Sequence, residues 1–145
     1  MSESLVKSLE HVLADTYALF LKTQNYHWNI EGRHFRSFHL MLEDQYEDLF
    51  KAIDVVAEVI RQSGAKVPAT FSVLAKNTKL KDGNEKLSAD DMLKDILHDN
   101  ELIQETLTAA LEEAHKANDE AVASFLGERL CVRKKAAWFV RSTLN

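Results

Sequence analysis

The scarcity of helix-breaking residues is the feature that most constrains how this chain folds. The 145 residues include only four Gly and one Pro, well below the usage of an average globular protein. Between the few breaks, apolar residues recur at the spacing of a helix. These breaks are widely spaced and lie at Gly32, Gly64, Gly83 and Asn118-Asp119. We therefore predict helices over residues 3–30, 34–63, 89–117 and 119–143.

The connection between the second and third predicted helices is unusually long. About 25 residues separate them, more than adjacent antiparallel helices require, and residues 70–76 within the connection are predicted to form a short helix. Ser88, three residues before Asp91, resembles the N-cap of the third helix. Four helices with one long crossover form the ferritin-like bundle. We expect an all-α fold of this kind in one domain over residues 1–145.

Composition and charge exclude several classes of protein. Apolar residues make up 46% and charged residues 28%, and no apolar run approaches the ~20 residues of a transmembrane helix. The first residues are acidic and amphipathic, unlike a secretory signal or a transit peptide. The single Cys131 excludes an internal disulfide and fits a reducing compartment, and we expect it in the core or an interface. These features predict a cytoplasmic location, where association with the nucleoid stays open.

Two histidines are placed symmetrically about the first break. His27 and His39 each lie six residues from Arg33, next to Gly32. If the flanking helices are antiparallel, the two imidazoles lie side by side and form half of a site for iron, zinc or copper. The alternative is that one histidine caps a helix end while the other packs in the core.

A pair of carboxylates is the second candidate for chemistry. Asp54 and Glu58 are four residues apart in a largely apolar stretch, so they share one helix face. They could instead form a solvent-facing stripe paired with Lys51 or Arg61. His39 and Asp54 are 15 residues apart on one predicted helix, or about 22 Å. A metal site that uses both pairs must therefore join two subunits of a twofold dimer with antiparallel second helices.

The sequence "HWNIEGRHFRSFH" followed by "DVVAE" resembles the Dps family, the miniferritins. The resemblance extends over essentially the whole chain, including "AAWFV" near the C-terminus. The matching residues are His27, Trp28, Asn29, Gly32, Phe35, His39, Asp54 and Glu58. The resemblance implies a hollow dodecamer of twofold dimers. Such a particle oxidises Fe(II), preferably with hydrogen peroxide although dioxygen is an alternative, and stores the Fe(III) mineral as protection against oxidative stress.

The resemblance also implies roles for individual residues. It predicts a ferroxidase with a di-iron site shared between two subunits, whose ligands are His27, His39, Asp54 and Glu58. Glu43 stands where the family often has an Asp, so it is a further candidate ligand. Trp28 could supply an electron when only one iron is bound, or simply pack in an interface. The family admits iron through acidic pores near the start of the fourth helix, where this chain has Asp119, Glu120 and Glu128; these acids could instead only complement the helix dipole.

Binding to DNA is the competing function. The alternative to an iron-storing ferroxidase is a nucleoid protein that coats DNA and has little iron chemistry. Relatives that bind DNA commonly use a Lys/Arg-rich tail, whereas here only Lys7 precedes residue 20 and the chain stops at Asn145. The net charge of −5 also opposes binding to phosphates. We therefore expect no appreciable DNA binding.

Two other pairs have the spacing of ligands in di-iron helical bundles. Glu112 with His115 follows the Glu-x-x-His spacing, and Asp95 with His98 has the same separation. A site inside one subunit needs two such motifs with further glutamates, all pointing into the core. We consider this arrangement an unfavoured alternative to the shared site.

Overall fold

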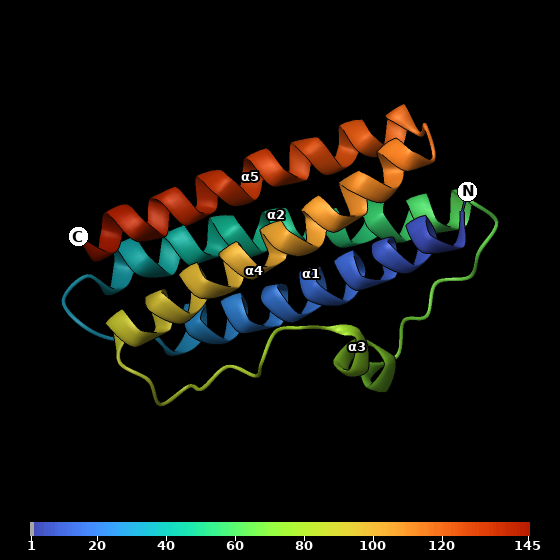
Figure 1. Cartoon of the computed structure of the whole chain (residues 1–145). Helices are drawn as coiled ribbons and strands as arrows, with labels where there is room; N and C mark the ends of the chain where they lie inside the picture. Colours follow the sequence, from blue (N-terminus) through green and yellow to red (C-terminus); the bar gives the residue numbers. More distant parts are fainter. Residues whose placement is uncertain (1) are drawn as a thin grey trace.

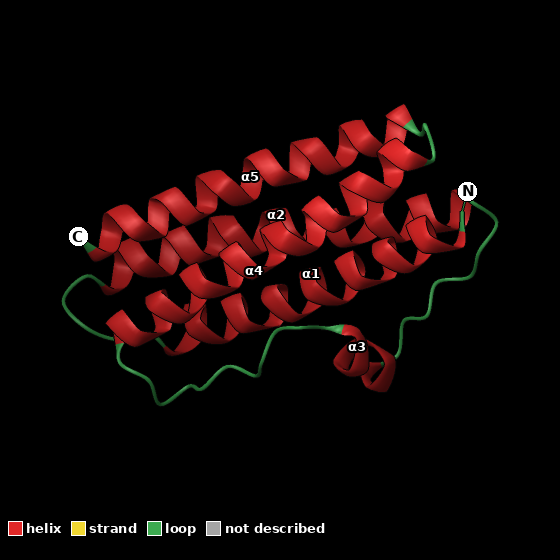
Figure 2. Ribbon diagram, in the orientation of Figure 1, coloured by secondary structure: helices red, strands yellow, loops and turns green. Residues whose placement is uncertain are grey.

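The computed structural model describes residues 2–145, and these residues form five helices and no strand. Figures 1 and 2 show the long helices side by side, joined by loops and by a long crossover that carries the short helix. The helices are α1 (Glu3–Asn29), α2 (Phe35–Gln62), α3 (Phe71–Asn77), α4 (Ala89–Lys116) and α5 (Glu120–Leu144). The four long helices and the short one are all confirmed, with ends within three residues of the prediction.

Helix ends follow from local chemistry. The Ser88 hydroxyl accepts a hydrogen bond from the Asp91 N–H and caps α4 as predicted. Asp119 accepts from the Val122 N–H and caps α5. Gly32 has a φ of +127°, a backbone conformation that side chains disfavour. It therefore allows the tight turn that returns α2 alongside α1.

The crossover is held to the bundle by a buried carboxylate. Asp15 of α1 is fully buried and accepts hydrogen bonds from the Thr78 hydroxyl at 2.6 Å and the Lys79 N–H at 2.9 Å. It also accepts from the Thr106 hydroxyl of α4 at 2.6 Å. Because a buried carboxylate needs such partners, Asp15 fixes the crossover to both helices. Figure 1 shows the crossover running along the bundle.

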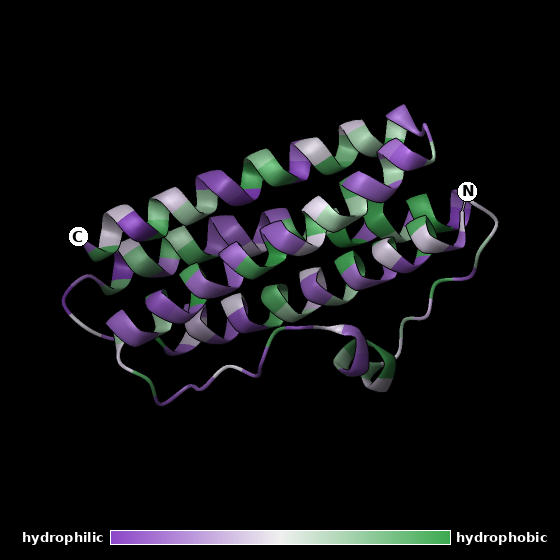
Figure 3. Ribbon diagram, viewed as in Figure 1, coloured by the Kyte–Doolittle hydropathy of each residue, from purple (hydrophilic) through white to green (hydrophobic). Residues whose placement is uncertain are grey.

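The core combines apolar packing with buried ion pairs. Leu, Ile and Val side chains from the long helices form most of it, and Figure 3 shows hydrophobic and hydrophilic residues alternating along each long helix. Lys22 pairs with Asp99 at 2.6 Å across α1 and α4. Asp48 of α2 pairs with Arg129 at 2.7 Å and Arg133 at 2.8 Å on α5. The architecture is the all-α, ferritin-like bundle with a long crossover that the sequence predicts.

The surface departs from one expectation. Cys131 is exposed in the single chain, which excludes the core alternative of the prediction. The expectation that it lies in an interface is untested. In residues 2–145 no helix combines the length and the apolar character needed to cross a bilayer.

Candidate metal centre

His27 and His39 lie side by side where α1 meets α2. Their rings stack with centroids 3.6 Å apart and planes within 15°. Nδ1 of His27 lies 2.8 Å from the carbonyl oxygen of His39, and Nδ1 of His39 lies 2.6 Å from the carbonyl oxygen of His27. The turn at Gly32 thus places two residues twelve apart in a reciprocal contact.

These reciprocal contacts fix which nitrogen can bind a metal. A carbonyl oxygen only accepts hydrogen bonds, so each Nδ1 must be the donor. In a neutral imidazole the proton is then on Nδ1, and Nε2 keeps its lone pair. A hydrogen bond from the non-ligating nitrogen is the usual support of a metal-binding histidine. The backbone therefore presents two Nε2 atoms that are ready to coordinate.

Glu43 extends the histidine pair into a three-residue cluster. It lies one helical turn after His39, and its Oε1 is 3.9 Å from Nε2 of His27. One ligand atom from each of His27, His39 and Glu43 lies within 4.8 Å of the others. Within residues 2–145 this is the one group of three or more such side chains. Two imidazoles and a carboxylate suit iron and zinc.

Aromatic rings enclose the histidine pair. Phe35 stacks on His39 with centroids 4.9 Å apart. The ring edge of Tyr46 meets His27 at 5.1 Å and 72°, and Phe20 lies next to Tyr46 at 6.0 Å. Tyr46 is not among the predicted site residues. Its spacing was a usable signal, because His39, Glu43 and Tyr46 follow the i, i+4, i+7 pattern of one helix face.

Asp54 and Glu58 lie apart from this cluster, toward the other end of α2. Both side chains are exposed in the single chain. Asp54 lies one helical turn before Glu58 on α2. Hydrogen bonding with Asp54, and then its charge, raises the pKa of Glu58. The guanidinium of Arg61 contacts the Ala65 carbonyl at 2.8 Å. Asp54 also borders an open hollow of about 550 Å³ lined by Tyr17 and Phe50.

The two alternative ligand pairs do not form a metal site inside the bundle. Glu112 and His115 are both exposed, so this pair does not point into the core. Asp95 accepts a hydrogen bond from Tyr26 and lies 3.3 Å from the Lys22 ammonium. Since Lys22 already compensates the interior carboxylates beside it, this region does not favour a second metal centre.

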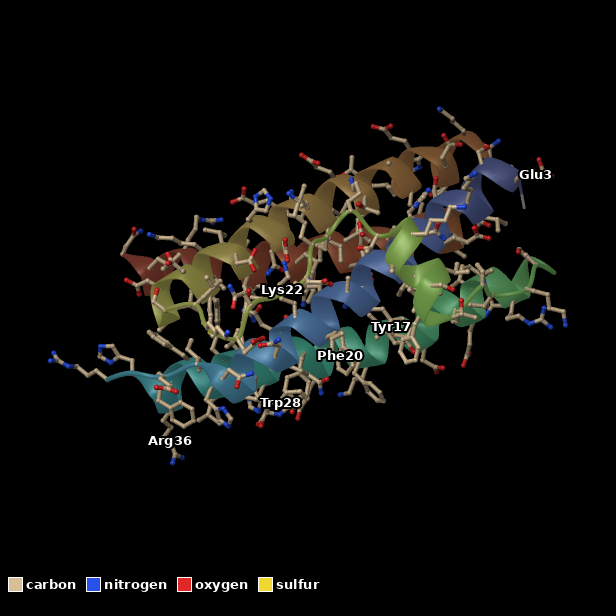
Figure 4. The ribbon with its side chains drawn as sticks, turned by 90° about the horizontal axis from the view of Figure 1, so that it is seen from below. Glu3, Tyr17, Phe20, Lys22, Trp28 and Arg36 are labelled. Atoms are coloured by element: carbon tan, nitrogen blue, oxygen red, sulfur yellow. The ribbon has the colours of Figure 1, made fainter. Side chains whose placement is uncertain are left out.

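The remaining predicted residues lie on the surface of the chain. Trp28 is 61% exposed and is labelled with Tyr17 and Phe20 along α1 in Figure 4. Asp119 caps α5 through its carboxylate, whereas Glu120 and Glu128 are exposed on that helix. The capping role is thus present, and the pore role stays a prediction.

Comparison with known proteins defines the class to which this fold and cluster belong. The family model of the ferritin-like domain matches residues 6–145. A "DNA protection during starvation protein" from Porphyromonas gingivalis is 32% identical over 94% of this chain and 86% of its own length. The Dps structure from Staphylococcus aureus is 25% identical with a TM-score of 0.95, covering 99% of this chain and 97% of that one.

A further solved structure shows the same similarity. The Dps protein from Vibrio cholerae, described as a member of a broad superfamily of ferritin-like diiron-carboxylate proteins, has a TM-score of 0.92 at 25% identity. It covers 97% of this chain and 89% of the other. The present chain belongs to the Dps family of ferritin-like proteins.

Proposed function

We propose that this protein oxidises Fe(II), preferably with hydrogen peroxide, at sites shared between two copies of the chain, and stores the Fe(III) product inside a hollow dodecamer. The relatives named for protection of DNA during starvation and the diiron-carboxylate description of the Vibrio cholerae protein support this function. Both descriptions refer to those proteins. For this chain the proposal rests on its own side chains.

The arrangement of His27 and His39 carries the proposal. Each imidazole donates Nδ1–H to the other residue's carbonyl, which leaves both Nε2 atoms free beside Glu43. The donor set accepts both Fe(II) and Fe(III), because imidazole is a borderline ligand and carboxylate a hard one. The histidines and Glu43 therefore hold and orient the substrate iron.

The second half of the proposed site comes from a partner copy. Along α2, Asp54 lies about 22 Å and Glu58 about 28 Å from His39, so the histidine cluster and the carboxylate pair of one chain cannot share an ion. An antiparallel twofold contact would bring the carboxylates of one α2 to the histidines of the other and create two identical sites. The carboxylates are exposed as such a contact requires.

Exposed apolar side chains support a contact on this face. Leu21 is 63% exposed, Trp28 61% and Phe50 64%. Leu21 and Trp28 are seven residues apart on one face of α1, and Phe50 of α2 lies against Phe20 of α1 with ring centroids 5.7 Å apart. Large apolar groups clustered at a surface usually mark an interaction site. A partner copy seated here would cover Trp28, so packing and electron donation both stay predictions for that residue.

We propose that Asp119, Glu120 and Glu128 form the path by which iron enters.

Two irons match the electron demand of the oxidant. Two Fe(II) ions, one peroxide and two protons give two Fe(III) ions and two waters. Each iron loses one electron, and the O–O bond accepts both. The carboxylates of Asp54, Glu58 and Glu43 balance the added positive charge, since ionised oxygen ligands favour Fe(III) over Fe(II).

Complementation between damaged chains tests the shared site. A His27→Ala/His39→Ala chain keeps its carboxylates, and an Asp54→Ala/Glu58→Ala chain keeps its histidines, so either oligomer alone is expected to lose fast Fe(II) oxidation. If the two variants co-assemble at random, half of the dimers contain one chain of each. In such a mixed dimer one of the two sites is intact. About a quarter of all sites should then recover.

The assembly state must be controlled in this experiment. The two chains are mixed during refolding or co-expression, and mass measurement confirms that single particles contain both. Parental particles mixed after assembly provide the matched control and should remain inactive. If confirmed mixed particles show no peroxide-driven Fe(II) oxidation, the shared site is wrong.

A further inference from the structure

The ligands brought together within one chain are sufficient for one cation. His27, His39 and Glu43 supply three ligand atoms within 4.8 Å of one another, whereas Asp54 and Glu58 are exposed elsewhere. Reduction of peroxide to two waters consumes two electrons, and one Fe(II) supplies only one. When a single iron is bound, the second electron must therefore come from a side chain, or the reaction releases hydroxyl radical.

Tyr46 is an oxidisable side chain in contact with the proposed ligands. Among residues 2–145, the rings that meet His27 are those of His39 and Tyr46. The phenol is only partly exposed, and Glu43 and Glu47 lie three residues before it and one residue after it on α2. Electron transfer through the ring of His27 would cover a single van der Waals contact.

The other tyrosines are less suitable donors. Tyr17 is ten residues from His27 on α1, which corresponds to about 15 Å along the helix. Tyr26 is fully buried, and its hydroxyl donates to Asp95 of α4. It therefore faces the interior between α1 and α4, away from α2.

Trp28 follows His27 in the sequence, but its side chain projects in a different direction from α1. Successive side chains of a helix project about 100° apart, and Trp28 is 61% exposed. Figure 4 places Trp28 and Phe20 along α1 where α2 lies beside it. In the single chain, Tyr46 rather than Trp28 has the ring contact with His27.

We infer that Tyr46 supplies the second electron when one Fe(II) occupies the histidine cluster. One Fe(II), one peroxide, the phenol of Tyr46 and one proton from solvent give one Fe(III), two waters and a neutral phenoxyl radical on Tyr46. Iron and the phenol each lose one electron, the phenol also loses its proton, and the O–O bond breaks without releasing hydroxyl radical. This inference rests on the proposed ferroxidase function.

A single-iron reaction tests this assignment. The assembled wild-type protein receives one Fe(II) per chain without oxygen, then one equivalent of hydrogen peroxide. Freeze-quenched electron paramagnetic resonance should show a tyrosyl radical, and peptide mass spectrometry should find oxidation at Tyr46. Because this measurement locates the oxidised residue in the wild-type protein, its result does not depend on whether a variant folds.

Conservative variants separate electron donation from packing. Tyr46→Phe keeps the ring edge against His27 but removes the phenol, so the radical should disappear and trapped hydroxyl radical should increase. Binding of Co(II), a probe that does not react with peroxide in this way, should be unchanged. Tyr17→Phe is the matched control and should keep the radical.

The outcomes distinguish this inference from the function on which it rests. Oxidation that maps to Trp28 or Tyr17, or a radical that persists in Tyr46→Phe, would overturn the assignment. So would the absence of any radical in a wild-type protein that oxidises two Fe(II) per peroxide at full loading. Failure of that full-loading reaction would instead overturn the proposed function.

Discussion

At the scale of residues, backbone carbonyl groups orient the two proposed histidine ligands. The Nδ1 atoms of His27 and His39 donate to each other's carbonyl oxygens, so no third residue is needed to set the tautomer. This requires the two helices to approach closely at matched levels, which the turn at Gly32 allows. The pair is therefore oriented by chain geometry before any ion binds.

Glu43 provides a prediction at this scale. Replacing Glu43 by Gln removes the carboxylate beside Nε2 of His27 with little change in shape. We expect Co(II) to bind at least about tenfold more weakly, because ligands and their close partners commonly contribute this much. Calorimetric titration measures the affinity, and Asp44→Asn is the matched control, since Asp44 is an exposed acid next in sequence. Unchanged affinity would show that Glu43 is a neighbour of the ion and not a ligand.

At the scale of elements, α2 carries most of the proposed site. It carries His39, Glu43 and Tyr46 in its first half and Asp54 with Glu58 in its second. Between them Asp48 receives two hydrogen bonds from Arg129, at 2.9 and 2.7 Å, and one from Arg133 at 2.8 Å. This clamp to α5 fixes the level and rotation of α2 in the bundle, and so the position of both ligand pairs.

The clamp makes stability depend on pH in a defined direction. Burial alone would raise the pKa of Asp48, but hydrogen bonds and charge from Arg129 and Arg133 lower it overall. Burial lowers the pKa of Arg133 to about 10, which leaves that guanidinium charged at neutral pH. A carboxylate with a depressed pKa stabilises the fold above its unfolded pKa of about 3.9. That contribution is lost as the pH falls through the lower folded pKa.

Asp48→Asn should therefore destabilise the protein at pH 7 and matter less in acid. Removing the charge leaves Arg129 and Arg133 uncompensated, and we expect a loss of about 2–4 kcal/mol in the free energy of unfolding. The difference from wild type should narrow below about pH 4. Urea denaturation at fixed protein concentration measures it, with Asp44→Asn as control. An equal difference at pH 3 and pH 7 would contradict the clamp.

At the scale of the whole molecule, charge limits the choice of partners. The chain has 18 basic and 23 acidic residues and a net charge of −5. A particle of twelve copies would carry about −60, and such a field repels phosphate backbones. The same charge favours the approach of cations such as Fe(II).

DNA binding is accordingly expected to be absent under physiological conditions. We predict no stable complex in gel-shift assays at pH 7 and about 150 mM salt. Iron oxidation measured on the same preparation shows that the particles are intact. A stable shift by active particles would contradict this prediction and favour the DNA-coating alternative.

The helices of this protein follow from the sequence alone, because they depend on local rules. Few Gly and Pro residues, apolar spacing and a cap at Ser88 are signals that act within a few residues, so the predicted helix ends agree with the structure. The position of His27 beside His39 was also predictable, since a short turn between antiparallel helices brings equidistant residues together.

Only the tertiary structure decided how the side chains around those histidines are arranged. The approach of Glu43 to His27 and the contact of Tyr46 with the same ring depend on the rotation of α2 against α1. That rotation is set by the packed core and by pairs such as Asp48 with Arg133, 85 residues apart. Such distant contacts leave no periodic pattern in the sequence. The exposure of Asp54, Glu58 and Cys131 was undecided for the same reason, because an apolar stretch of helix does not show which of its faces the fold will cover.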